Sequence, residues 1–417
     1  MLFDWHDSVK AVNPQTGHIR ASVRDLMGML KDPEFASSVY CCDENMHIER
    51  EEFFAKFVRV IQTPNELILQ RMFVSHNNGP FSTLSVVMPC RQRTYGVVAV
   101  SRRGLLQRLG KCAPDDIIEL TQETDQVVIN NLTDGTSSTS RGIDNKHLPN
   151  MPTGIEPCVS SFKVHSDALL QCFDYCKPSL SFSLLAPDGN AYLHLKVLGR
   201  KRAGSLAAVA VNGYVVMHFE SSVRGHFPDE SVLLTAIPKF CVERLCWMLR
   251  GQEETVELSI TPSGGFVSWK HYRVNFLRPE TPLSDLTELA KASEKTLRST
   301  VVDVADLKRA LWQNESIWQK DNGSIMCLKQ EGVGLSVSFV VNGKVQGEKS
   351  LIPAENLSGK SDDFYINAWA IHRALENVKP DLVEIRGYPN AEKPIYFKGL
   401  GDPYWVLIVQ GSKMRLD

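Results

Sequence analysis

A strand-to-helix pattern that recurs six times along the chain constrains its fold more than any other feature. Each copy begins with alternating apolar residues, passes a capping or turn residue, and continues with apolar residues three and four positions apart, as on an amphipathic helix. Successive copies begin about 50 to 70 residues apart, an interval typical of a repeated supersecondary unit. The copies span residues 46–60, 96–110, 161–175, 233–247, 300–314 and 364–378.

The segments between these copies predict two or three further strands each, because they carry β-branched or alternating apolar residues between turn signals. Strands in runs, with one helix per run, indicate an α+β fold with antiparallel sheets instead of a doubly wound parallel sheet. A Gly- and Ser-rich stretch (132–154) and a polar link (291–300) predict boundaries. We therefore expect three domains, at residues 46–154, 155–290 and 291–417, after an N-terminal extension at residues 1–45 that does not match the repeat.

Bulk composition excludes several classes of protein. The chain has 417 residues, 43% hydrophobic and 23% charged, with a formal net charge of −2, which is ordinary for a soluble globular protein and argues against a surface that is basic throughout. No run approaches the roughly 18 apolar residues of a membrane span. The N-terminus lacks the basic and apolar regions of a secretory signal. We expect a cytoplasmic protein with no membrane contact.

The ten cysteines are expected to be reduced in that compartment. Cys172 and Cys176 share a predicted helix face, as Cys241 and Cys246 do approximately. No CxxC or HxxxH motif supplies further ligands, so the spacing predicts buried thiols and no metal site.

Several weak sequence signals, taken in their order and spacing, carry a resemblance to a known family. They are the final segment 364–409 with its closing tyrosine and hydrophobic strand, the central segment 209–221 (VAVNGYVVMHFES), and the strand, helix, hairpin and Pro-Asn turn of 98–151. With the repeat count, these segments make the sequence resemble the bacterial sliding clamp, the β subunit of DNA polymerase III. The resemblance covers residues 46–417 and leaves residues 1–45 outside.

The resemblance implies the DNA-clamp fold: three similar domains of two strand–helix–strands units each, with antiparallel sheets outside and helices lining a ring. Two copies would join head to tail into a homodimer. The ring would encircle double-stranded DNA without reading its sequence and tether DNA polymerase and clamp-loader subunits through short peptide motifs. It would act in DNA replication as a non-catalytic processivity factor that raises the effective concentration of polymerase at the primer.

A ring that slides should attract phosphates through basic helices without specific base contacts. Five of the six predicted helices are basic in a net-acidic chain, and the third, near His165 and Asp167, is the exception. Solvated helices often carry Lys and Arg, so these side chains have an ordinary alternative explanation. The expected DNA-facing residues are Lys56, Arg59, Arg102, Arg103, Arg108, Lys239, Arg244, Lys308, Arg309 and Arg373.

The resemblance also implies an apolar pocket between the second and third domains that captures peptide tails of polymerases and loaders. Where the family commonly has Thr, His and Arg, this chain has Val211, Tyr214 and Val215, so a pocket here would prefer different peptides. The alternative is that these residues form only strand core. The expected pocket residues are Val211, Gly213, Tyr214, Val215, Val216, Pro279, Trp405, Val406, Leu407 and Ile408.

No phosphate-binding loop, G-x-S-x-G elbow or HExxH motif is present, so the sequence favours a protein without catalytic residues or cofactor. A second hypothesis keeps the clamp fold without the ring: a binding module that mimics or sequesters a host clamp or its partners. A third, an unrecognised α+β enzyme, would require clustered titratable residues in a pocket. Self-association separates the first hypothesis from the second.

Overall fold

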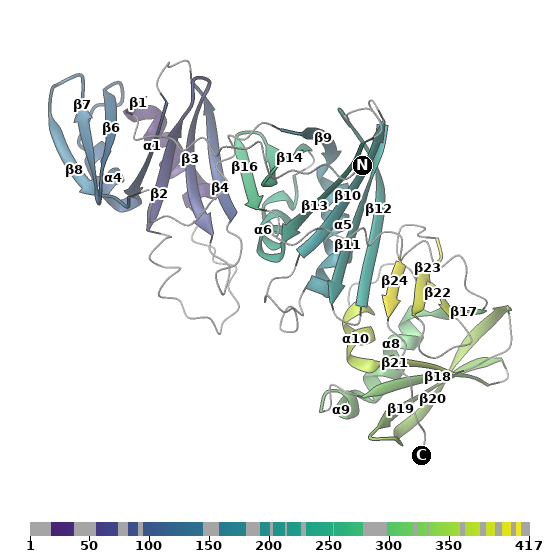
Figure 1. Cartoon of the computed structure of the whole chain (residues 1–417). Coiled ribbons are helices and arrows are strands. Elements are labelled where there is room, and N and C mark those ends of the chain that lie inside the picture. The colour runs from purple at the N-terminus through teal and green to yellow at the C-terminus, as the bar shows by residue number, and fades with distance from the viewer. Residues whose placement is uncertain are drawn as a thin grey trace. The chain divides into compact units, whose positions relative to one another are not determined.

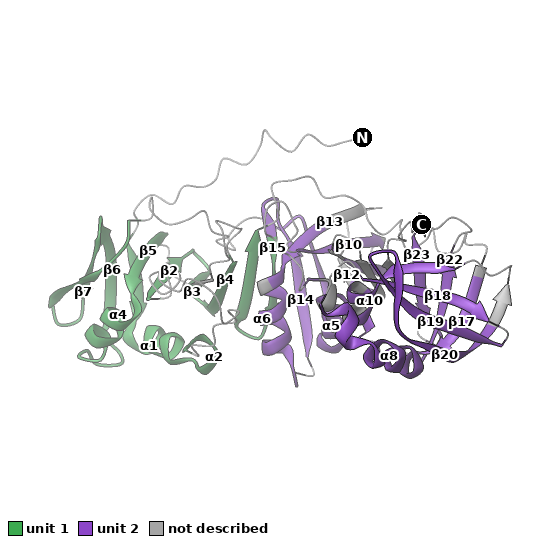
Figure 2. Cartoon of the chain, turned by 90° about the horizontal axis from the view of Figure 1, so that it is seen from below, with its two compact units in different colours: residues 1–157, 265–277 green, residues 158–264, 278–417 purple. Residues whose placement is uncertain are grey.

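The computed structural model divides the chain into two compact units, each described here by itself (Figure 2). Residues 1–157 and 265–277 form the first unit, and residues 158–264 and 278–417 form the second. The structure describes residues 18–36, 56–73, 82–90, 95–144, 158–180, 192–200, 203–212, 215–226, 231–252, 254–277, 298–320, 324–331, 333–358, 363–375, 381–387, 394–401 and 406–409.

The first unit consists of two antiparallel sheets with helices packed beside them (Figure 1). One sheet has the order β1-β6-β7-β8, and the other, from its pairings, the order β5-β2-β3-β4-β16. The strands are β1 (Ile19–Ser22), β2 (Phe57–Gln62), β3 (Glu66–Phe73), β4 (Ser82–Pro89), β5 (Gly96–Ser101), β6 (Ile117–Glu123), β7 (Gln126–Asn131), β8 (Ser137–Arg141), β15 (Gly264–Trp269) and β16 (Tyr272–Leu277). The helices are α1 (Val23–Lys31), α2 (Pro33–Ala36) and α4 (Arg102–Leu109).

The spacing of buried residues along the strands and helices of this unit shows which of their faces are covered. Buried and less buried residues alternate along β6 and β7, as expected for strands with one covered face. By contrast, all six residues of β2 are buried, so both of its faces are covered. In α1, Val23, Leu26, Met29 and Leu30 form one buried stripe at helical spacing, and α1 packs on α4.

The second unit is one run of antiparallel strands with helices (Figure 1). Its first part has the order β13-β10-β11-β12-β9-β14, and its second part the order β24-β23-β22-β17-β20-β19-β18-β21. The elements of the first part are β9 (Ser160–His165), α5 (Ser166–Leu180), β10 (Tyr192–Arg200), β11 (Ala203–Asn212), β12 (Val215–His226), β13 (Ser231–Pro238), α6 (Lys239–Leu249) and β14 (Thr255–Ile260). Those of the second are β17 (Arg298–Asp303), α8 (Val304–Gln313), α9 (Glu315–Trp318), β18 (Ile325–Glu331), β19 (Gly334–Val341), β20 (Lys344–Ser358), β21 (Phe364–Asn367), α10 (Ala368–Leu375), β22 (Leu382–Gly387), β23 (Ile395–Gly399) and β24 (Val406–Val409).

The antiparallel sheets with few helices confirm the expected α+β class. In the described part of the chain, six strands run directly into a helix: β1–α1, β5–α4, β9–α5, β13–α6, β17–α8 and β21–α10. These helices pack in three pairs, α1 with α4, α5 with α6, and α8 with α10. The repeat therefore exists as three helix pairs supported by antiparallel strands.

The first copy of the repeat was placed wrongly by the sequence pattern. Of residues 46–60, those from Phe57 onward form strand β2, and residues 46–55 lie outside the described part. The first strand–helix unit is instead β1–α1, in which Ile19 pairs with Leu120 of β6 and the Ser22 side chain accepts a hydrogen bond from the Asp25 backbone N–H. Residues 18–36, expected in a separate extension, are therefore built into the first unit. The pairing of β1 with β6 and the Ser22 cap of α1 therefore define the first strand–helix unit, although the local pattern at 46–60 predicted it there.

The contact-based division differs from the expected domains in two further ways. The β15–β16 hairpin follows β14 in sequence, yet residues 265–277 belong to the first unit, where β16 pairs with β4. The segments expected to form the second and third domains fall within one unit. The three-domain division stays a prediction.

No helix in the described part of the chain is long and apolar enough to cross a membrane.

Candidate nucleic-acid interface

Helix α4 carries two exposed cations among the predicted DNA-facing residues, Arg103 and Arg108. Ser101 accepts a hydrogen bond from the Gly104 backbone N–H and begins the helix, while Leu105 and Leu109 are buried. Arg103 and Arg108 lie on its exposed side, and neither forms an ion pair within the described part of the chain. Both guanidinium groups are therefore available to a polyanion.

Arg102 lies between α4 and its neighbour α1. Its Nη2 donates a hydrogen bond of 3.1 Å to the carbonyl oxygen of Leu30, in the last turn of α1. Carbonyl groups at a helix C-terminus lack intrahelical partners and attract cations. This contact gives Arg102 a structural role despite its place in the first turn of α4, where the helix dipole disfavours positive charge.

Two further cations on the α1–α4 pair were missed because residues 1–45 were assigned to an extension. Lys31 is exposed in the last turn of α1, where its charge opposes the helix dipole favourably. Arg24 is exposed and contacts Asp115 at 2.7 Å. The apolar spacing from Val23 to Leu30, directly after a serine cap, is the signal that could have identified this helix.

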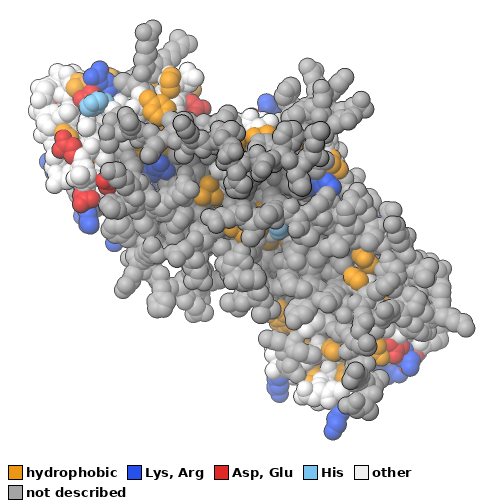
Figure 3. All heavy atoms as spheres, viewed as in Figure 1, with side chains coloured by type: hydrophobic (Ala, Val, Ile, Leu, Met, Phe, Trp, Pro, Cys, Tyr) orange, Lys and Arg blue, Asp and Glu red, His pale blue; other side chains and the backbone are white. Residues whose placement is uncertain are grey.

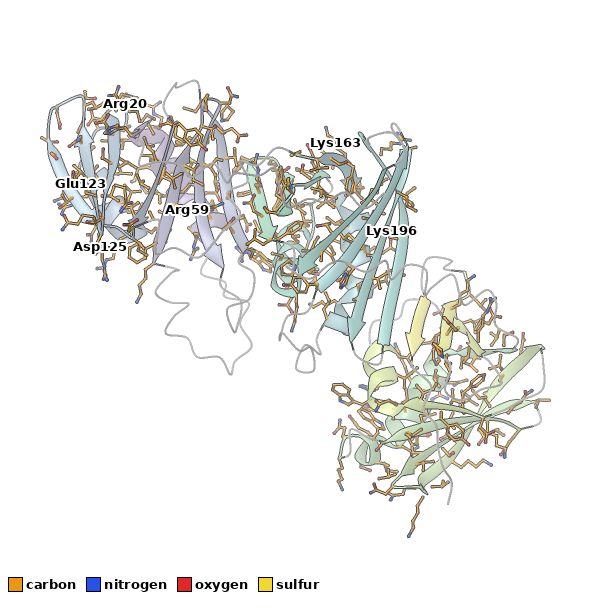
Figure 4. The ribbon with its side chains drawn as sticks, viewed as in Figure 1. Arg20, Arg59, Glu123, Asp125, Lys163 and Lys196 are labelled. Atoms are coloured by element: carbon orange, nitrogen blue, oxygen red, sulfur yellow. The ribbon has the colours of Figure 1, made fainter. Side chains whose placement is uncertain are left out.

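Arg59 is not on a helix and does not face solvent. It lies in β2, with its backbone opposite Gln70 and Ala99 in the flanking strands (Figure 4). The side chain is buried, its Nη1 donates to Gln70 Oε1 at 3.3 Å, and burial lowers the pKa of the guanidinium to about 10. Lys56, just before β2, is exposed. Arg59 is thus a core residue, and its assignment to a basic helix was wrong.

A buried polar row continues from Arg59 across the same sheet. The amide of Gln70 donates to the hydroxyls of Thr83 and Ser85 at 2.9 and 3.3 Å. Asn275, in β16, donates to the same two hydroxyls at 2.9 Å each. This row joins β2, β3, β4 and β16, so the hydrogen bonds fix the β15–β16 hairpin to the first unit.

The predicted DNA-facing side chains of helix α6 interact with other side chains of the same helix. Arg244 is only 4% exposed, and its guanidinium carbon lies 4.6 Å from the ring centroid of Trp247, a cation–π distance. Lys239 lies 3.8 Å from Glu243, one turn along the helix. Although α6 was expected to be DNA-facing, its charges are mostly satisfied within the helix.

Helices α8 and α10 hold the remaining predicted cations. Lys308 is half-buried, and Arg309 is exposed and contacts Asp306 at 2.9 Å. Both line a cleft of about 420 Å³ between the two helices. The backbone of Arg373 lies in α10, and its side chain is outside the described part.

The strands expected to form a peptide pocket are neighbours. In the pairing of β12 with β24, Val215 is opposite Val409, Val216 opposite Ile408, Met217 opposite Leu407 and His218 opposite Val406. Val211 lies in β11, opposite Val216. The backbone thus brings together the β11–β12 hairpin and the C-terminal strand, which are about 190 residues apart in sequence. Four expected residues, Gly213, Tyr214, Pro279 and Trp405, lie outside the described residues.

The cysteines predicted to be buried thiols between the middle helices have that environment. Cys172, Cys176, Cys241 and Cys246 on α5 and α6 are all buried. Desolvation raises the pKa of Cys172 well above its ordinary value and that of Cys246 to about 12, so both remain protonated and unreactive at neutral pH. Within the described residues, no group of three or more His, Cys, Asp or Glu side chains is placed to hold a metal ion.

On the face drawn in Figure 3, described Lys and Arg side chains are scattered and interspersed with acidic ones, and do not gather into one patch.

Comparison with known proteins gives the fold. No protein-family model and no curated protein sequence matches the chain. Solved structures do match: a DNA polymerase III subunit beta from Pseudomonas aeruginosa has a TM-score of 0.63 at 13% identity, covering 95% of this chain and 100% of that one. The DNA polymerase sliding clamp from Caulobacter crescentus has a TM-score of 0.62 at 12% identity, with the same two coverages.

The chain has the sliding-clamp fold. A DnaN sliding clamp from Bartonella birtlesii, solved bound to griselimycin, agrees with a TM-score of 0.59 at 13% identity over 95% of this chain and 100% of that one. The resemblance noted in the sequence is therefore confirmed at the level of structure. The match covers this chain nearly from end to end.

Proposed function

We propose that this protein is a DNA sliding clamp: a ring of head-to-tail copies that encircles duplex DNA and tethers a polymerase without catalysing a reaction itself. The observation that carries the proposal is the fold match, which covers 95% of this chain and all of a DNA polymerase III subunit beta. The described part of this chain contains three helix pairs and the antiparallel strands that support them. The proposal places the protein in the cytoplasm, with the replication machinery.

Contact with DNA is assigned to exposed cations on the paired helices. Arg103 and Arg108 of α4 and Lys31 of α1 are exposed and supply most of the attraction. Half-buried Lys308 and exposed Arg309 of α8 add a second group. Charge of this kind neutralises phosphates without reading bases, which suits a protein that must slide.

Ring closure is assigned to two sheet edges. In the described part of the chain, β8 pairs only with β7 and ends the four-stranded sheet, while residues 344–353 of β20 pair only with β19. Edge strands carry unsatisfied backbone N–H and C=O groups that invite pairing with another chain. We assign β8 of one copy to pair with β20 of the next, a heterologous contact that closes into a ring when its rotation allows.

Partner capture is assigned to the β12–β24 region, where Val216 lies opposite Ile408 and Met217 opposite Leu407. Apolar strand residues beside a hairpin suit short peptides with hydrophobic anchors. The peptides would come from a polymerase and a clamp loader. Their sequence preference is specific to this chain, since Tyr214 and Val215 replace the residues common in the family.

Retention on DNA of different topology tests the proposal. Protein placed on nicked circular duplex should stay bound through gel filtration at high salt, and it should be lost when the circle is cut into a linear molecule with free ends. Equal loss from both substrates would contradict encirclement. If the chain instead bound polymerase peptides as a monomer, the ring-free binding module would be the correct function.

A further inference from the structure

We propose that the cleft between α8 and α10 binds single-stranded DNA, with one base stacked on Trp312 and the adjoining phosphates held by Lys308 and Arg309. The inference deepens the proposed function, because it assigns a single strand as a further ligand to the α8 cations that the proposed function places against duplex phosphates. It does not require ring closure.

The cleft has the size and apolar lining of a ligand site. Its volume of about 420 Å³ lies in the range typical of small-ligand pockets, roughly 300 to 1,000 Å³. Leu311 and Leu375, both buried, line it together with His372. The imidazole ring lies 4.4 Å from the buried ring of Trp318, which limits its movement.

Trp312 is the most exposed tryptophan that the structure describes, at 71%. An indole ring left in water is costly, and its two faces are suited to stack with a nucleobase. Trp312 makes no ring or cation contact with any described residue. Trp247 of α6 shows the contrasting case, since the guanidinium of Arg244 already lies over its ring at 4.6 Å. Both faces of the Trp312 ring are therefore free of described ring or cation contacts, whereas one face of Trp247 is occupied by Arg244.

Positive charge lies one helical turn from the ring of Trp312. Lys308 and Trp312 are four residues apart in α8, which places both on one face. Among the described residues, Lys308 has no ion pair and no acidic side chain lines the cleft. Arg309 pairs with Asp306 at the surface, a contact weak enough for a phosphate to replace. An aromatic platform beside a cation is the arrangement that holds single strands without sequence preference.

The alternative occupant is a second copy of the chain, and the charges argue against it. The strand assigned to meet β20 across the ring is β8, whose residues are four hydroxyl-bearing side chains and Arg141. None of these is an apolar anchor for the lining of the cleft or an anion for Lys308. A nucleic-acid strand supplies both a flat ring and a negative charge.

The test measures binding of a fluorescein-labelled oligothymidylate by anisotropy, using the full-length protein. Trp312→Ala should weaken binding at least about 5-fold, while Trp312→Phe should retain most of the affinity. Lys308→Ala should reduce the slope of log affinity against log salt by about 0.7, the value for one phosphate contact with a single strand. Trp247→Ala is the matched control and should leave oligothymidylate affinity unchanged.

Two further measurements on the same variants distinguish a loss of single-strand binding from a loss of the ring. They are retention on circular duplex and native mass. We expect Trp312→Ala to keep both, so loss of single-strand binding would be independent of the proposed ring. Unchanged oligothymidylate affinity in Trp312→Ala would overturn the inference. If that variant also lost subunit association, Trp312 would be a contact between copies instead.

Discussion

Helices α4 and α6 occupy equivalent places in the repeat, each following a strand directly and packing against one partner helix, yet they differ in available charge. On α4, Arg103 and Arg108 extend into solvent. On α6, Arg244 is buried over Trp247, and Lys239 contacts Glu243. Counting basic residues on amphipathic helices therefore overestimates the charge that DNA can reach.

The largest expected effect comes from reversing charge on α4. Arg103→Glu with Arg108→Glu should lower affinity for duplex DNA roughly 10- to 100-fold at low salt, because two phosphate contacts become repulsive. The slope of log affinity against log salt should fall by about 2. Lys163→Glu, an exposed charge on strand β9 (Figure 4), is the control and should change neither quantity. An unchanged salt slope in the α4 variant would remove α4 from the interface.

Arg244→Ala should act on stability instead. Removing a buried guanidinium together with its contact to Trp247 should reduce the free energy of unfolding by about 1 to 3 kcal/mol. Urea denaturation measures this, and the salt slope of DNA binding should stay at its original value. A stable Arg244→Ala protein with a reduced salt slope would show that α6 and α4 are equivalent after all.

The cap of α4 should matter by a smaller amount. Ser101→Ala removes the hydrogen bond to the Gly104 N–H and should cost about 1 kcal/mol of stability. Ser101→Asn keeps a capping acceptor and should restore most of the loss. If both variants were equally unstable, a contact of the serine other than capping would be responsible.

The smallest expected effect comes from removing the acidic partner of Lys239 on α6. Glu243→Gln removes the partner of Lys239, a half-buried pair at the helix surface worth at most about 1 kcal/mol. Duplex affinity should then rise about 2-fold, with a salt slope larger by up to about 0.9. No change in either quantity would mean that Lys239 does not face DNA.

The sequence was sufficient for the fold class, the last five strand–helix units and the clamp resemblance, because periodicity and repeat spacing are local properties. It also indicated both strands of the β12–β24 pair. It failed at residues 46–60, where a local pattern imitated the repeat and the real first unit depended on pairing between β1 and β6. Long-range pairing of this kind leaves little trace in a local window.

The two buried arginines did leave signals. Arg244 lies on the same helical stripe as Cys241, Leu245 and Met248, all buried, so its position already predicted a covered side chain. Arg59 alternates with Val58 and Val60 in a strand whose faces are both covered. Coverage of the second face could not be predicted, because it depends on the tertiary structure. The exposure of the Trp312 side chain likewise depends on tertiary packing and could not be predicted from the sequence.

The most direct test of the central claim is native mass by light scattering across a dilution series. A closed ring of two copies should give a species at about twice the 46.7 kDa chain mass that persists on dilution. A monomer at every concentration, with circular duplex present or absent, would contradict the ring.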